Sequence, residues 1–177
     1  MAEMVDVRKA LFDWSAAVTG RPARWANQPA GRPTGPYVMM NLLGALPIGY
    51  PAEVYSDQDP GDGVDLDDTA TQDALLQVSV NVVGEAAPGD ALDAMMNLIA
   101  SMKLFTTQEL FDGSGLGFSR ASGPRDLSEE RQGKRETRHQ ADFFFHMQWQ
   151  RSEVLNTIRK VSINNGINGS TIVVEET

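Results

Sequence analysis

The chain has 177 residues, of which 41% are hydrophobic, and this length and composition fit one folded domain with a sizeable core. It contains no cysteine, which excludes disulfides, thiolate metal sites and a cysteine nucleophile. The net charge of −9 opposes tight binding to nucleic acid, because neutralising phosphates requires a basic surface. The acidic start and the lack of a long apolar stretch predict no signal peptide and no membrane span, so we expect a protein made in a cytoplasm.

The first predicted element is an amphipathic helix over residues 5–18, which ends before Gly20. Its apolar residues recur at helical spacing, at Val7, Leu11, Trp14 and Val18. Residues 21–36 then hold four prolines and three arginines, a composition that opposes both a helix and a central strand. We therefore predict an extended arm over 21–36, with Trp25 anchoring it onto the body.

Two short strands and an acidic loop are predicted next. Residues 37–43 read as a buried strand, and 53–55 as a second strand that pairs with it across a turn region at 44–51. Residues 57–73 contain seven acids and no base, which predicts a solvated, mobile loop.

The middle of the chain predicts a strand followed by a helix. Residues 76–82 alternate apolar and polar residues, the pattern of a strand with one buried face. Asp90 is placed to cap a helix whose apolar stripe comprises Leu92, Met95, Met96, Ile99 and Met102. A short helical turn is expected at 107–111.

The remaining segments predict strands joined by hairpins. They are a strand at 116–122, a charged and mobile hairpin excursion at 123–138, a long strand at 140–151 with Trp149 on its apolar face, and extended pieces at 158–163 and 171–175. The sum is a single α+β domain over residues 1–177, with a mostly antiparallel or mixed sheet and two main helices packed on one face.

No catalytic, cofactor or metal site is predicted. The two histidines, His139 and His146, fall seven residues apart on one strand and so on opposite faces, where they cannot form a dyad. The glycine-rich segment 113–118 precedes a strand, whereas phosphate-binding loops precede a helix. Asp57, Asp59 and Asp68 have part of the spacing of a calcium loop, but Asp62 occupies the position that requires glycine.

A basic cluster is the strongest candidate for a contact surface. Glutamates interleave with its four cations, and no aromatic residue adjoins them to stack on bases, so a nucleic-acid site is disfavoured. A charged hairpin that meets an acidic surface on a neighbouring subunit is the better functional interpretation. The candidate contact residues are Trp25 and the cluster itself, Arg131, Lys134, Arg135 and Arg138.

Several segments in order resemble the bacteriophage neck or tail terminator proteins, especially those of contractile-tailed phages. They are the segment 25–29 (WANQP) leading to 36–38 (PYV), the strand 75–85 (LLQVSVNVVGE), then 116–118 (LGF), 123–128 (GPRDLS) and the aromatic strand that follows Arg138. The resemblance covers nearly the whole chain. It is carried by the order of these segments, because the family has no catalytic signature.

The resemblance implies a virion protein that forms a ring of its own copies, typically six, at the head-proximal end of the tail tube. Such a ring stops polymerisation of the tube and sheath and docks to the head-tail connector. DNA would pass through the ring without sequence-specific binding, and an acidic lining is compatible with that passage.

Two other interpretations stay open at this stage. One is a different neck component, a tail-completion or head-completion protein. The other is a small ligand-binding module or enzyme, which would require a concave pocket with convergent polar groups.

Overall fold

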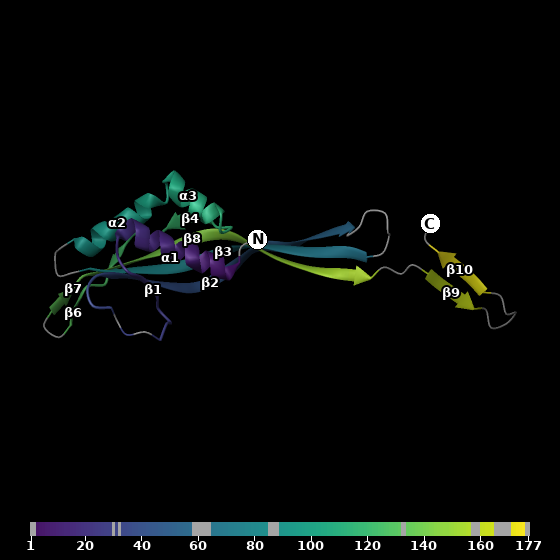
Figure 1. The fold of residues 1–177 in the computed structure, drawn as a ribbon, viewed down its shortest axis with the longest axis horizontal. Coiled ribbons are helices and arrows are strands. Elements are labelled where there is room, and N and C mark those ends of the chain that lie inside the picture. Colours follow the sequence, from purple (N-terminus) through teal and green to yellow (C-terminus); the bar gives the residue numbers. More distant parts are fainter. Residues whose placement is uncertain are drawn as a thin grey trace. The chain divides into compact units, whose positions relative to one another are not determined.

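The computed structural model describes residues 3–29, 31, 33–57, 65–84, 89–131, 134–156, 160–164 and 171–175. Its three helices are α1 (Met4–Thr19), α2 (Asp90–Ser101) and α3 (Phe105–Asp112). The strands are β1 (Ala23–Trp25), β2 (Tyr37–Asp57), β3 (Asp65–Val83), β4 (Gly117–Ala121), β5 (Arg125–Asp126), β6 (Glu129–Arg131), β7 (Lys134–Glu136), β8 (Arg138–Asn156), β9 (Lys160–Asn164) and β10 (Thr171–Glu175). The α+β fold class predicted from the sequence is confirmed, and Figure 1 shows the elements in place.

The main sheet is mixed. Its strand order is β1-β2-β3-β8-β4, and β5 also pairs with β8. The three-residue strand β1 runs parallel to β2, whereas β4 and β5 run antiparallel to β8. The remaining described strands form two separate two-stranded sheets, β6-β7 and β9-β10.

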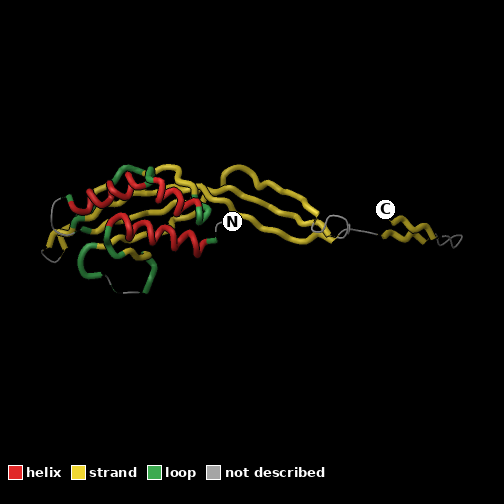
Figure 2. Tube along the Cα trace, turned by 45° about the horizontal axis from the view of Figure 1, so that its top comes forward, coloured by secondary structure: helices red, strands yellow, loops and turns green. Residues whose placement is uncertain are grey.

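The contacts divide the chain into two compact units. Unit 1 comprises residues 1–50 and 72–149, and unit 2 comprises residues 51–71 and 150–177. Unit 1 contains all three helices, which lie beside its strands in Figure 2. Strands β2, β3 and β8 each contribute residues to both units, and the expectation of a single domain stays a prediction.

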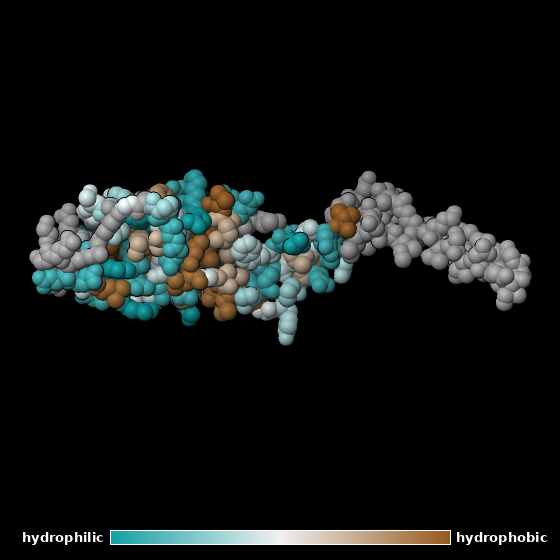
Figure 3. Space-filling model, turned by 90° about the horizontal axis from the view of Figure 1, so that it is seen from below, coloured by the Kyte–Doolittle hydropathy of each residue, from teal (hydrophilic) through white to brown (hydrophobic). Residues whose placement is uncertain are grey.

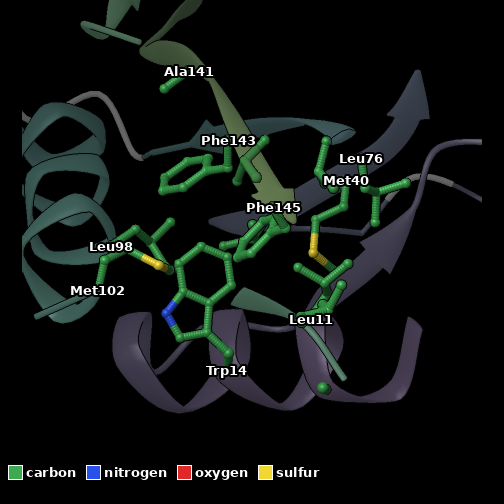
Figure 4. Packing of buried hydrophobic residues seen from close by; sticks show 14 of the residues in the cluster. Leu11, Trp14, Met40, Leu76, Leu98, Met102, Ala141, Phe143 and Phe145 are labelled. Carbon is green, nitrogen blue, oxygen red and sulfur yellow. The ribbon is translucent and has the colours of Figure 1, made fainter. Parts of the chain in front are cut away.

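The three helices cover one face of the sheet in unit 1. The indole of Trp14 in α1 packs edge-on against Phe143 of β8 and Phe111 of α3, with ring centroids 5.2 and 5.6 Å apart. Its Nε1 donates a hydrogen bond to Ser101 Oγ at the end of α2, at 2.9 Å. One buried tryptophan therefore joins all three helices to the same strand. Figure 4 shows Trp14 within the buried cluster that also holds Leu98, Met102 and Phe143.

The alternating pattern of β3 and β8 sets which side chains enter this core. Leu76, Val78, Val80 and Val82 are buried on β3, and Ala141, Phe143, Phe145 and Met147 are buried on β8. Both sets were predicted from the period of two. The next residue of that period on β8, Trp149, is instead 41% exposed, so the buried face ends before it.

The turn predicted at 44–51 is absent, because β2 is one continuous strand from Tyr37 to Asp57. The glycines and prolines in 44–51 normally mark turns, but prolines are tolerated in edge strands. Strand β1 pairs only with residues 38–40, and no described strand covers the outer edge of β2 beyond them. The prolines therefore lie where β2 forms the edge of the sheet.

The acidic loop predicted at 57–73 is wrong for residues 65–73, because these residues belong to β3, which begins at Asp65. Backbone hydrogen bonds with neighbouring strands override the acidic composition of residues 65–73. Residues 58–64, which include Asp59 and Asp62, lie outside the described residues, so the prediction for them stays untested.

Helix α2 begins where expected but presents a different face. Its N-cap is Gly89, with φ of 88°, and Asp90 is its first residue rather than its cap. The buried apolar side chains are Ala91, Ala94, Met95 and Leu98, followed by Met102. Of the predicted stripe, Leu92 and Met96 are exposed, so the real stripe is rotated towards the two alanines.

The other predicted elements are confirmed. They are the first helix, the short helix after α2, the strand at 117–121, the long strand β8 and the antiparallel pair β9-β10. In the described part of the chain, no helix is both long enough and apolar enough to cross a bilayer.

Candidate assembly surfaces

Trp25 anchors the arm, as predicted. It lies in β1, opposite Met40 of β2, and is only 6% exposed. The guanidinium of Arg8 from α1 lies over its ring, 4.5 Å from the centroid, a cation–π contact that ties the arm to the helix. Packing within the chain therefore accounts for the indole, and its role in contacts between subunits stays a prediction.

Arg138 is held inside the sheet. Its Nε and Nη2 both donate to Asn81 Oδ1 of β3, at 3.1 and 2.8 Å, and its backbone N–H donates to Ser128 Oγ at 3.1 Å. Leu127 N–H in turn donates to the Arg138 carbonyl at 2.8 Å. Arg138 thus fixes the base of the charged hairpin on the sheet, a role that the sequence did not indicate.

The other three cations of the basic cluster lie on the hairpin formed by β6 and β7. The register pairs Arg131 with Lys134, Glu130 with Arg135, and Glu129 with Glu136. Arg131 and Lys134 are therefore cross-strand neighbours next to the turn.

The sheet face away from the helices carries a polar ladder between β3 and β8. Gln140 Nε2 donates to Ser79 Oγ at 2.8 Å, and Gln77 Nε2 donates to Asp142 Oδ2 at 3.5 Å. Ser79, Asn81 and Asp142 are all buried, although alternate positions of the sequence place them opposite the apolar core. The ladder, together with the Arg138–Asn81 pair, fixes the register of the two strands.

An apolar hollow follows this ladder on the same face. Leu75 of β3 and Phe144 of β8 line it together with Leu43, Ala45 and Leu46 of β2. Arg120 of β4 lies over the Phe144 ring, 4.6 Å from its centroid. Gln77 and Arg120 also line the hollow, so its walls combine apolar side chains with one amide and one cation.

The adjoining segment of β2 is exposed over eight consecutive residues, 43–50. Leu43 is 50% exposed, Leu46 67%, and Tyr50 97%. Figure 3 shows hydrophobic residues, in brown, gathered in a band across the surface of the unit that contains the helices. Large exposed apolar residues along an edge strand are a common mark of an interaction surface.

Strand β2 also presents polar and aromatic groups in unit 2. Tyr55 Oη donates to Glu53 Oε2 at 3.4 Å. The negative charges of Asp68 and, to a smaller extent, Glu53 raise the pKa of Tyr55, because both disfavour the phenolate.

The strand spacing predicted that the two histidines form no dyad, and in the structure they lie in different parts of β8. His146 is exposed and lines a hollow with Asp73 and Gln148, where Gln148 Nε2 donates to Asp73 Oδ1 at 3.2 Å. His139 lies in the stretch of β8 that pairs with β5. Within the ranges that the structure describes, no three His, Asp or Glu side chains are grouped so that they could hold a metal ion.

Comparison with known proteins gives one informative match. The sequence profile of a family described as phage neck terminator protein matches residues 5–171. No curated protein matches the chain significantly.

Two solved structures are similar over most of their length. One is 18% identical, with a TM-score of 0.44, and the match covers 83% of this chain and 96% of that one. The other, from the virion of a native gene transfer agent particle, is 16% identical with a TM-score of 0.35, and the match covers 85% and 96%. Because both TM-scores are below 0.5, only the match to the family profile shows which family the chain belongs to.

Proposed function

Because the chain belongs to the phage neck terminator protein family, and so to the structural proteins of the phage neck, we propose that it assembles with its own copies into a ring, typically of six. The ring lies at the head-proximal end of the tail tube, ends polymerisation of the tube and sheath, and docks to the head-tail connector. DNA passes through it without sequence-specific binding. The observation that carries this proposal is the family match over 5–171, nearly the whole chain.

The proposed role is structural rather than catalytic. The polar groups that converge on the sheet, Asn81, Ser79 and Asp142, hydrogen-bond to side chains of the neighbouring strand or loop. They therefore stabilise the strand register. What the described surface offers outward is an apolar strand segment and a charged hairpin, which are features of contact surfaces.

The charged hairpin supports a contact between subunits. Arg131 and Lys134 are paired across β6 and β7, and an acidic partner would relieve their mutual repulsion. The same chain carries seven acids between residues 57 and 73. We propose that the hairpin of one subunit meets this acidic segment of the next, a heterologous contact of the kind that closes rings.

Reversal of one hairpin charge tests this contact. We expect Lys134→Glu to raise the protein concentration at which the ring half-dissociates by about tenfold, because a charge at the rim of the contact would become repulsive. Light scattering across a concentration series, with and without purified tail tubes, measures the change. High salt should reduce the difference from wild type, since it screens exposed charges.

Lys103→Glu is the matched control, because it makes the same change of charge at an exposed position between α2 and α3. If both variants weaken the ring equally, general repulsion is responsible and the hairpin contact is wrong. Arg138 is unsuitable for this test, because its guanidinium is bound to Asn81 within the subunit. A wild-type protein that stays monomeric at every concentration, even with tubes, would contradict the ring itself.

A further inference from the structure

Helix α2 carries apolar side chains that the core does not use. Leu92 and Met96 are 36% and 49% exposed, although a helix packed by one face usually turns polar residues outward. They are four residues apart, so they lie on the same side of the helix, one turn from each other. Asp93 is exposed beside them, three residues before Met96. These three residues form an outward-facing group, the α2 strip, with two apolar side chains and one carboxylate.

The α2 strip lies at the same end of unit 1 as the charged hairpin. The N–H of Gly84, just after β3, donates to the carbonyl of Thr137, the residue that follows β7. Figure 1 shows the start of α2 and the β6-β7 hairpin at this end of the unit. Lys103 follows the opposite end of α2 and lies outside the strip. The strip is therefore at the end of the unit that is already proposed to join subunits.

The hollow beside β2 lies on the opposite side of the sheet. Its residues Leu75 and Phe144 alternate with Leu76 and Phe143, which are buried in the core under the helices. The hollow has a volume of about 330 Å³, which leaves room for a large apolar side chain. Leu46 of β2 also lines it and is 67% exposed. Both sides of the sheet therefore expose apolar groups.

Arg120 gives the hollow its charge. Its guanidinium lies over the Phe144 ring, 4.6 Å from the centroid, and donates no hydrogen bond to any residue in the described part of the chain. A guanidinium held in this way keeps its N–H groups free for a carboxylate, which it binds through two parallel hydrogen bonds. Gln77, by contrast, donates to Asp142 Oδ2 at 3.5 Å. The hollow thus suits an apolar side chain with a carboxylate next to it.

A second copy of the chain meets this requirement. A ring built by heterologous contacts needs two different, complementary surfaces on each subunit, and the α2 strip and the hollow lie on opposite sides of the sheet. The three helices carry six acidic and two basic residues, so the helix side is acidic, whereas the hollow presents a cation. The helix side of one copy therefore attracts the hollow of another, whereas two helix sides would repel each other.

We propose that the α2 strip of one subunit docks in the hollow of the neighbouring copy. The two apolar side chains of the strip pack against Leu46 and Phe144, and the carboxylate of Asp93 binds the guanidinium of Arg120. This inference rests on the proposed ring and names a second contact in it, in addition to that of the charged hairpin. Burial of the apolar side chains supplies the driving force, and the ion pair fixes how the two copies are aligned.

Exchanging the two charges tests the pairing. We expect Arg120→Glu alone and Asp93→Arg alone each to raise the half-dissociation concentration of the ring at least about tenfold, because like charges then face each other. A chain with both substitutions restores an attractive pair, so its half-dissociation concentration should return to within about threefold of wild type. Light scattering across a concentration series measures these values, and circular dichroism with thermal unfolding checks that each variant folds.

Glu109→Arg combined with Arg120→Glu is the matched control, because Glu109 is an exposed acid of the same helix layer, on α3. This combination changes the charges by the same amounts as the exchange with Asp93. Its ring should stay at least about tenfold weaker than that of wild type. If it recovers as well as the exchange with Asp93 does, net charge alone explains the recovery and the pairing is wrong.

Cysteine cross-linking tests the apolar part of the contact. The chain has no cysteine, so Met96→Cys and Leu46→Cys each introduce a single thiol. The two variants, one with a mass tag, are mixed, assembled and oxidised, and a covalent pair of unequal chains is expected. Because the strip and the hollow lie on opposite sides of the sheet, one chain cannot form this link within itself. Replacing Met96→Cys by Leu110→Cys, on α3, should abolish the link.

The outcomes separate this contact from the ring on which it rests. If Arg120→Glu and Asp93→Arg both assemble like wild type, or if an assembled ring gives no cross-link, the contact is wrong and the ring stands. If Arg120→Glu leaves the ring intact but abolishes its binding to purified tail tubes, the hollow receives the tube protein and the commitment to a second copy fails. If wild type never assembles, the proposed function fails as well.

Discussion

Individual residues join α2 to the end of β3. Arg21 Nη1 donates to the Val83 carbonyl at 3.0 Å, and its Nη2 donates to Asp90 Oδ1 at 2.6 Å. Gly84 follows β3 directly, and its N–H donates to the Thr137 carbonyl at 2.8 Å. A single arginine thus binds both the last carbonyl of the strand and the first carboxylate of the helix.

Gly84 is expected to tolerate no side chain. A Cβ there would lie 2.6 Å from Thr137 Oγ1, 2.7 Å from Asp90 Oδ2 and 3.0 Å from Ala91 Cβ. We expect Gly84→Ala to lower the free energy of unfolding by about 1–3 kcal/mol, because these groups must shift. Chemical denaturation measures the loss. Gly123→Ala is the control, since a Cβ at Gly123 meets nothing within 4 Å, and an equal loss in both variants would contradict this explanation.

At the scale of elements, helix α2 shows what the sequence pattern predicts well and what it does not. The helix, its start and the burial of Met95 and Met102 were predictable from spacing. Its rotation was not, because the packed face includes Ala91 and Ala94, whose small side chains add little to an apolar stripe. Contact with the sheet and α1 sets that rotation, and such contacts are not visible in local periodicity.

Two adjacent methionines test this rotation. Met95 is fully buried, whereas Met96 is 49% exposed. We expect Met95→Ala to destabilise the protein by about 2–5 kcal/mol, through lost burial and a cavity, and Met96→Ala to change stability by less than about 0.5 kcal/mol. Urea denaturation of both variants measures the difference. Equal losses would favour the stripe predicted from the sequence over the one in the structure.

Of the surface features, some were predictable from the sequence and others were not. The basic hairpin was predictable, because the charges of Arg131, Lys134 and Arg135 are visible in the sequence. The exposed apolar segment of β2 was missed, because its glycines and prolines indicate a turn unless the strand is known to be an edge. Arg138 was assigned to the same cluster as the hairpin cations, since sequence proximity does not reveal its hydrogen bonds to Asn81.

For the whole molecule, the net charge of −9 gives a prediction about DNA. We expect no measurable binding to duplex DNA at about 150 mM salt, because the 24 acidic residues outnumber the 15 basic ones and neutralising phosphates requires a basic surface. Fluorescence anisotropy of a labelled duplex, titrated with the assembled protein, checks this. Binding that weakens steeply as salt rises would contradict free passage of DNA and indicate a phosphate-binding surface.

The three tryptophans give the molecule an intrinsic optical reporter. Trp14 and Trp25 are 1% and 6% exposed, whereas Trp149 is 41% exposed. Emission from the folded subunit should therefore have a blue-shifted part that acrylamide quenches poorly and a red-shifted part, from Trp149, that it quenches well. A Trp149→Phe variant would leave only the shielded emission, so that loss of the core could be followed by fluorescence without any label.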